Sequence, residues 1–267
     1  GSGRKTAGPP RVRTANPGDP YSWSVVTARH GASTLERPED AVAERDSSAD
    51  PVPLLDPKSW RDRLVPAMPT GGWRGWIGPI AVTIIAAALR LTDLGRPRAL
   101  IFDETYYAKD GLSLLRFGTE QQFKPEANDL IIASNGDPST LDVFNGGAAY
   151  VVHPPLGKWV IAAGESVFGV TPFGWRIPMA IIGILSVLLL ARIVRRLLRS
   201  NLWGTVAGGL LAVDGLGIVM SRTAVLDNVL MGTTLAALGC LLLDRDQTRR
   251  RVANSLPAGI DPWLLWD

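Results

Sequence analysis

Cysteine and histidine are almost absent from this sequence. Its 267 residues include one cysteine, Cys240, and two histidines, His30 and His153. A single cysteine excludes a disulfide framework and a cysteine-ligated zinc site, and two histidines do not favour a histidine-rich metal site. The formal net charge of +3 is too small to indicate a nucleic-acid partner. We therefore expect no metal, no other cofactor and no nucleic-acid partner.

Residues 1–70 lack isoleucine and phenylalanine altogether, and they hold 10 of the 20 prolines. Such a segment buries too little apolar surface to offset the entropy that is lost on ordering. It also lacks the basic start, apolar centre and small-residue cleavage site of a secretory signal. The composition thus predicts a disordered tail that is not processed and stays in the cytoplasm.

Charge is missing from several long apolar runs in the rest of the chain. Three of these runs are wholly uncharged, and a fourth is apolar apart from Asp214: Ile77–Leu89, Ile177–Ala191, Asn228–Leu243 and Leu202–Met220. With their flanks they approach the ~20 residues that a helix needs to cross a bilayer. They predict an all-α membrane protein with spans near 73–92, 175–194, 202–220 and 225–243. The contrast with the tail excludes a single water-soluble globular domain.

Arginine clusters orient these spans. Arginines follow the runs Ile177–Ala191 and Asn228–Leu243, at 192–199 and at 249–251. Because cytoplasmic loops carry the excess of basic residues, both clusters are expected in the cytoplasm. Alternation of the spans then places the N-terminus inside and a long loop, 93–174, outside. Segment 156–170 is moderately apolar but carries Lys158 and Glu165, so we expect a helix on the membrane surface rather than a fifth span.

The outer loop begins with a pair of acids. Asp103 and Glu104 follow the apolar Ile101 and Phe102 and precede a helical pattern that contains Tyr106 and Tyr107. Adjacent carboxylates at a helix start can serve as catalytic groups. From their spacing alone, an N-cap with an acidic first turn is the favoured explanation.

Further polar residues gather at the outer ends of the predicted spans. His153 and Lys158 flank two prolines and a predicted helix start, where each can contact a substrate or play only a structural role. Arg176 lies at the mouth of the second span, suited either to a lipid phosphate or to headgroup contact. Arg222 and Asp227 lie in the last outer turn, where they can pair with each other or belong to a site.

Three segments in this order carry a family resemblance: FDETYYAKD at 102–110, HPPLGKW at 153–159 and GWRIP at 174–178. The sequence resembles the bacterial protein O-mannosyltransferases, most of all the actinobacterial members, over about 73–251. The resemblance implies a GT-C-type glycosyltransferase fold whose first outer loop forms juxtamembrane helices over the site. Family members have more spans than this chain, so we expect 71–267 to be the N-terminal part of the membrane domain.

The resemblance also implies a reaction and its participants. The family transfers mannose from polyprenyl-phosphate mannose to Ser or Thr hydroxyls of exported proteins, and we expect inversion at the extracytoplasmic face of the plasma membrane. Its catalytic acid pair falls on Asp103 and Glu104, and its essential arginine falls on Arg176. We expect Asp103 to be the base, Glu104 to orient it or the acceptor, and Arg176 to bind the donor phosphate.

Other residues have weaker assignments. Lys158 and Arg222 are further candidates for the donor phosphate, and the remaining substrate-site candidates are His153, Tyr106, Tyr107 and Asp227. Membrane lipid and a secretion channel are possible partners.

Two alternatives remain. The first is a related polyprenyl-phosphate-sugar transferase that acts on a lipid or a cell-wall glycan. The second is a non-catalytic multi-pass protein, such as a transporter or scaffold subunit. Further spans downstream would favour a transferase over the second alternative.

Overall fold

The computed structural model describes residues 13–15, 23–25, 64–69, 72–134, 136–137 and 142–255. The chain divides into two compact units, 1–54 and 55–267, which are treated separately. In the first unit, β1 (Arg13–Ala15) and β2 (Trp23–Val25) form an antiparallel pair. The prediction of a disordered tail did not include these strands, and most of residues 1–70 lies outside the described part.

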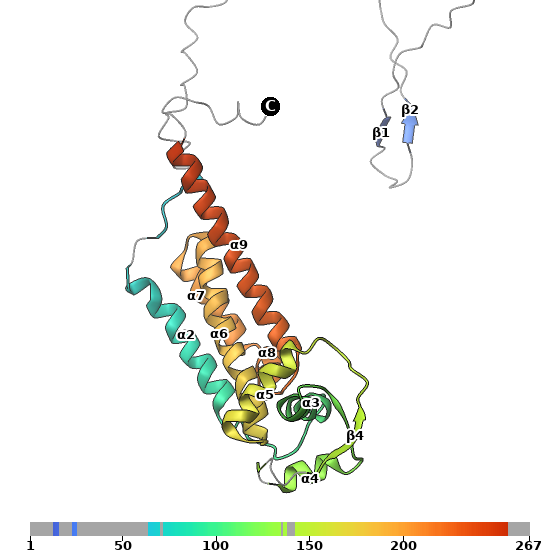
Figure 1. Ribbon diagram of the computed structural model, residues 1–267. Helices are drawn as coiled ribbons and strands as arrows, with labels where there is room; N and C mark the ends of the chain where they lie inside the picture. Colours follow the sequence, from blue (N-terminus) through green and yellow to red (C-terminus); the bar gives the residue numbers. More distant parts are fainter. Residues whose placement is uncertain are drawn as a thin grey trace, which may run out of the picture. The chain divides into compact units, whose positions relative to one another are not determined.

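Three helices of the second unit are long and apolar enough to cross a membrane: α2 (Arg74–Leu91), α6 (Pro172–Leu198) and α9 (Asp227–Ser255). They run side by side in an elongated bundle (Figure 1), in which α6 contacts both α2 and α9. Large apolar side chains of α2 such as Ile84 and Ile85 stay exposed, as expected of a surface that faces lipid. The predicted multi-pass helical membrane fold is confirmed.

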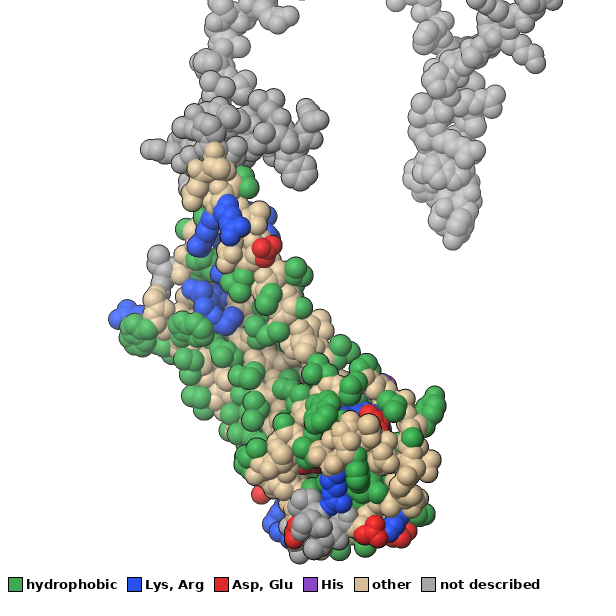
Figure 2. Space-filling view, in the orientation of Figure 1, with side chains coloured by type: hydrophobic (Ala, Val, Ile, Leu, Met, Phe, Trp, Pro, Cys, Tyr) green, Lys and Arg blue, Asp and Glu red, His purple; other side chains and the backbone are tan. Residues whose placement is uncertain are grey.

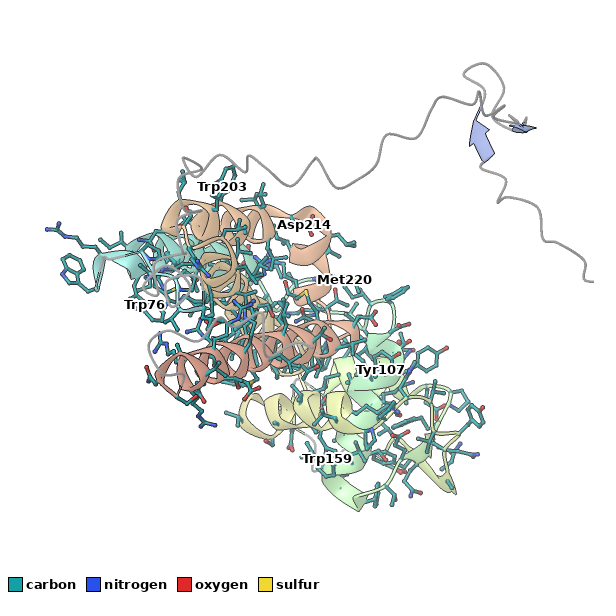
Figure 3. All side chains as sticks on the ribbon, turned by 90° about the horizontal axis from the view of Figure 1, so that it is seen from above. Trp76, Tyr107, Trp159, Trp203, Asp214 and Met220 are labelled. Carbon is teal, nitrogen blue, oxygen red and sulfur yellow. The ribbon has the colours of Figure 1, made fainter. Side chains whose placement is uncertain are left out.

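The third predicted span is broken. It consists of α7 (Asn201–Val213) and α8 (Gly215–Ser221), which are bent by 64° at Asp214, and Figure 3 labels Asp214 at this bend. Asp214 has an extended backbone, and its side chain accepts a hydrogen bond from Gly217 N, so it ends one helix and caps the next. The predicted span near 202–220 thus coincides with a bent pair of helices, which together are long and apolar enough to count as a fourth span.

Buried Arg90 of α2 satisfies the carbonyls that this break exposes. Its guanidinium donates to the carbonyl oxygens of Leu211 and Ala212 at 3.1 and 2.9 Å. The last carbonyls of a helix have no partner within that helix. An arginine from a helix more than a hundred residues earlier thus supplies what the end of α7 lacks.

The segment between α2 and α6 folds into short elements at one end of the bundle (Figure 1). These are α3 (Glu104–Phe117), β3 (Gln121–Phe123), α4 (Ala127–Ala133), β4 (Phe144–Ala148) and α5 (Leu156–Phe168). Helix α5 packs against α3 and α6, and Leu112, Ile161 and Trp175 join these helices in one apolar core. With 13 residues α5 is too short to span a bilayer, in keeping with the predicted surface helix. The antiparallel pair β3–β4 was not predicted.

Charge is distributed unevenly along the bundle. Figure 2 shows hydrophobic side chains over much of the spanning helices and lysine and arginine side chains gathered toward the C-terminal end of α9. Arg196 of α6 pairs with Asp246 of α9 at 3.5 Å, so both arginine-rich helix ends lie at the same end of the bundle. Tyr107 and Trp159 lie toward the opposite end from Trp76 and Trp203 (Figure 3).

Candidate active site

One face of α3 lines a cavity of about 670 Å³. Asp103, Tyr106, Tyr107 and Asp110 all contribute to it, because residues three, four and seven apart lie on the same face of a helix. The remaining lining residues come from β3 and from the chain after β4: Gln121, Gln122, Phe123, Ala149, Tyr150, Val152 and His153. The cavity therefore brings together Asp103, both predicted tyrosines and His153.

Asp103 is the carboxylate of the acid pair that opens onto this cavity. It occupies the N-cap position of α3, yet its side chain makes no capping hydrogen bond. It is half-buried, which leaves its carboxylate accessible from the cavity. Just before it, Phe102 has a positive φ of 50°, which is uncommon for a residue other than glycine. The simple N-cap explanation of Asp103 does not match this geometry.

Glu104 points the other way and is fully buried in a clamp with Arg176. Arg176 Nε donates to Glu104 Oε1 at 2.7 Å and Arg176 Nη2 donates to Oε2 at 2.7 Å. Glu104 also accepts the backbone N–H of Ile101 at 3.1 Å and that of Ala224 at 3.0 Å. A single carboxylate thus ties together the start of α3, the start of α6 and the turn before α9.

Arg176 has no donor left for a ligand. Its other N–H groups point to the carbonyl oxygens of Leu94, Pro97 and Ala99, at 3.3, 3.0 and 2.9 Å. A guanidinium has five N–H groups, and these three carbonyls together with Glu104 engage all of them. The predicted contact between Arg176 and a lipid phosphate would require some of these bonds to break, so the geometry favours a positioning role instead.

Lys158 is likewise engaged within the protein. Its ammonium is fully buried between Asp110 at 3.0 Å and Glu120 at 2.9 Å, and we call these three side chains the lysine triad. The predicted phosphate contact of Lys158 does not match this position, because the ammonium neither reaches the surface nor lines the cavity. Burial raises the pKa of Asp110, an effect that Lys158 opposes.

Tyr107 lies at the centre of the acidic surroundings. Burial raises the pKa of its phenol, and the charges of Asp103, Asp227 and Asp110 raise it further. The phenol therefore stays protonated at neutral pH and can donate a hydrogen bond. His153 packs edge-on against Tyr107, with ring centroids 6.0 Å apart, and adopts a positive φ of 69°.

Arg222 and Asp227 lie beside this region but not in the cavity wall. Arg222 donates to the carbonyls of Leu89, Arg90 and Asp93 at 2.8, 3.4 and 3.4 Å, which satisfies the end of α2. Among the described ion pairs, none joins Arg222 to Asp227. Asp227 begins α9, and its charge acts on Tyr107.

The cavity contains residues that the sequence reasoning missed. Asp110 follows Asp103 by seven residues, so helical spacing from Asp103 could have indicated it. Gln121, Gln122 and Tyr150 come from segments with no such signal, because their place depends on how β3 and β4 fold back on α3. Within the described residues, no group of three or more histidine, cysteine, aspartate and glutamate side chains is placed to hold a metal ion.

Comparison with known proteins identifies the relatives of this chain. Residues 152–253 match the family described as dolichyl-phosphate-mannose-protein mannosyltransferase. A polyprenol-phosphate-mannose--protein mannosyltransferase of Mycobacterium tuberculosis is 38% identical in an alignment of 244 residues that covers 87% of this chain and 41% of that protein. The proteins of the same name from Mycolicibacterium smegmatis and Corynebacterium glutamicum are 38% and 35% identical, over 70% and 66% of this chain. These alignments cover 32% and 31% of the lengths of those two proteins. No solved structure matches.

The helices and the family match define a multi-pass helical membrane protein that is similar, over residues 152–253, to a family of GT-C-type membrane glycosyltransferases. More particularly, the chain is homologous to the polyprenol-phosphate-mannose--protein mannosyltransferases and contains part of the family's domain, so the resemblance inferred from the sequence is confirmed. The chain spans about two fifths of the length of the mycobacterial relative, 41%.

Proposed function

We propose that the full-length protein transfers mannose from polyprenyl-phosphate mannose to Ser or Thr hydroxyls of proteins, with Asp103 as the general base. The observation that carries this proposal is that the two adjacent acids have different environments. The Glu104 carboxylate is buried and hydrogen-bonded to Arg176, whereas Asp103 lines the cavity. The names of the relatives, which specify a polyprenol-phosphate-mannose donor and a protein acceptor, support the choice of substrates.

The reaction requires that the protein position the two substrates and supply one proton acceptor. The acceptor hydroxyl is a weak nucleophile, so the Asp103 carboxylate takes its proton as the oxygen attacks C1 of mannose. The bond from C1 to the phosphate oxygen breaks, and its electron pair leaves with the polyprenyl phosphate. Attack from the side opposite the leaving phosphate inverts the anomeric configuration.

The clamp and the cavity walls have supporting roles in this mechanism. Glu104 and Arg176 fix the backbone from which Asp103 projects, because they join the start of α3 to α6 and to the turn before α9. The phenol of Tyr107 can donate a hydrogen bond to a substrate oxygen, and His153 and Tyr106 complete the wall beside Asp103.

We place the reaction on the extracytoplasmic face of the plasma membrane. Both arginine-rich helix ends lie at the end of the bundle away from α3 and α5, which supports this orientation under the positive-inside rule. Acceptors on that face are exported proteins, and a secretion channel that delivers them unfolded would be a natural neighbour.

A transfer assay tests the proposal. Membranes that contain the full-length protein would be incubated with polyprenyl-phosphate mannose labelled in the sugar and with a Ser/Thr-rich peptide. The same peptide with every Ser and Thr changed to Ala is the matched control. We expect label in the first peptide only. Label in a lipid or a cell-wall glycan instead would favour the related transferase, and no transfer by correctly inserted protein would overturn the proposal.

A further inference from the structure

The cavity continues past Asp103 to a second carboxylate on the same face of α3. Asp110 lies seven residues after Asp103, which is about 10.5 Å along the axis at 1.5 Å per residue. Both residues line the cavity. Asp110 is unassigned by the mechanism above, which uses only Asp103 as a reacting carboxylate.

The lysine triad holds the Asp110 carboxylate in place without closing it off. Asp110 Oδ2 lies 3.0 Å from the buried Lys158 ammonium, and 15% of the Asp110 side chain remains exposed. Glu120 pairs with the same ammonium but is only 4% exposed and does not line the cavity. The two acids thus share one cation, and only one of them faces the space where a substrate can bind.

We propose that Asp110 is a specificity residue that accepts a hydrogen bond from a hydroxyl of the donor sugar. This inference rests on the proposed function, which puts the reacting carbon beside Asp103. In that mechanism the acceptor hydroxyl lies next to Asp103, so the pyranose ring that it attacks extends along the cavity from Asp103 toward Asp110. Gln121 and Gln122 line the same cavity. A side-chain amide has two N–H donors, and Gln121 gives one of its two to Thr119 Oγ1 at 3.0 Å, so both residues keep a donor for other sugar oxygens.

The buried ammonium explains why Asp110 suits this task. A carboxylate whose orientation is already fixed loses little entropy when it binds a hydroxyl. A hydrogen bond to a charged group discriminates more strongly than one between neutral groups. The other explanation is that Asp110 only neutralises Lys158, in which case Glu120 and Asp110 should be equivalent.

That contrast supplies a matched pair of variants, Asp110→Asn and Glu120→Gln. Each removes one negative charge from the lysine triad and leaves Lys158 paired with the other acid, so neither leaves a buried ammonium unpaired. Full-length protein would be assayed with polyprenyl-phosphate mannose and with its single-deoxy analogues. Equilibrium binding of the corresponding non-transferable phosphonates would be measured in parallel.

We expect the wild-type protein to disfavour at least one deoxy analogue by about 10- to 100-fold in kcat/KM and in affinity, the usual worth of a hydrogen bond to a charged group. Asp110→Asn should lower the affinity and the kcat/KM for the mannose donor to the values of the deoxy analogue, which abolishes the discrimination. Glu120→Gln should keep the discrimination. Equal discrimination in both variants, or none in the wild type, would overturn the proposal. If transfer fails but binding still discriminates through Asp110, the proposed function fails and this inference stands.

Discussion

Two adjacent carboxylates of this chain have opposite environments. Side chains of consecutive helical residues point about 100° apart, so Asp103 and Glu104 cannot face the same space. Glu104 points into the protein, where Arg176 and two backbone N–H groups satisfy it. Asp103 points into the cavity. A motif of two neighbouring acids therefore contains one structural group and one group that is free for chemistry.

The clamp yields a prediction about stability. Arg176→Ala leaves the buried Glu104 carboxylate without its cation, which typically costs about 3–5 kcal/mol. We expect a strong fall in the thermal unfolding midpoint of Arg176→Ala in detergent, and a clear fall for Glu104→Gln.

The double variant is the control for the clamp. Because the two side chains interact directly, the two losses of stability should not add, and the combined loss should be well below their sum. Additive losses would show that Arg176 does not act through Glu104. If an Arg176→Ala variant is stable but binds the donor more weakly, Arg176 binds the donor phosphate instead.

At the scale of elements, the break between α7 and α8 depends on a contact that is distant in sequence. Asp214 starts α8, but the exposed carbonyls of Leu211 and Ala212 are satisfied from α2 by Arg90. No water reaches such groups in the interior of a bilayer, so a backbone break is tolerated there only when the protein supplies partners.

Arg90→Met should therefore destabilise the bundle. Methionine keeps most of the length of the side chain but cannot donate, and each carbonyl left unsatisfied costs about 1–3 kcal/mol. We expect a lower unfolding midpoint and faster proteolysis near Asp214. Arg74→Met is the matched control, because Arg74 is exposed at the other end of the same helix and has no such contact. Equal behaviour of the two variants would contradict this role of Arg90.

The sequence predicts the spanning helices better than it predicts the break or the site. Helices α2, α6 and α9 could be predicted because bilayer thickness requires long uncharged runs, and such runs are visible in the sequence. The break at Asp214 could not, since it depends on Arg90. Likewise the sequence indicated Asp103 and His153, but not that Arg176 and Lys158 are occupied by partners inside the protein. Whether a cation is free is decided by tertiary contacts.

At the scale of the whole molecule, the arginine-rich helix ends and the cavity lie at opposite ends of the helix bundle. The arginine-rich ends of α6 and α9 meet through Arg196 and Asp246, and the cavity lies among the elements at the other end (Figure 1). This arrangement suits an enzyme whose donor is anchored in the bilayer and whose acceptor arrives from the extracytoplasmic side.

Cysteine labelling tests that orientation. With Cys240 replaced, single cysteines would be introduced as Tyr150→Cys, at a side chain that is 91% exposed, and as Gln247→Cys, at an exposed position of α9. A membrane-impermeant reagent applied to intact cells should label position 150 and not position 247, and both should be labelled after permeabilisation. The reverse pattern in intact cells would refute the topology.

The most direct test of the central claim is the transfer rate of Asp103→Asn in the full-length protein. Asparagine keeps the shape of the side chain and cannot take the proton of the acceptor. The wild-type side chain makes no capping hydrogen bond, so no cap is lost in the variant. Loss of a positioned general base costs about 10²–10⁴-fold in rate, and we expect kcat to fall by that factor while donor affinity stays nearly unchanged. Wild-type turnover by Asp103→Asn, in protein shown to be inserted and folded, would contradict the assignment of Asp103 as the base.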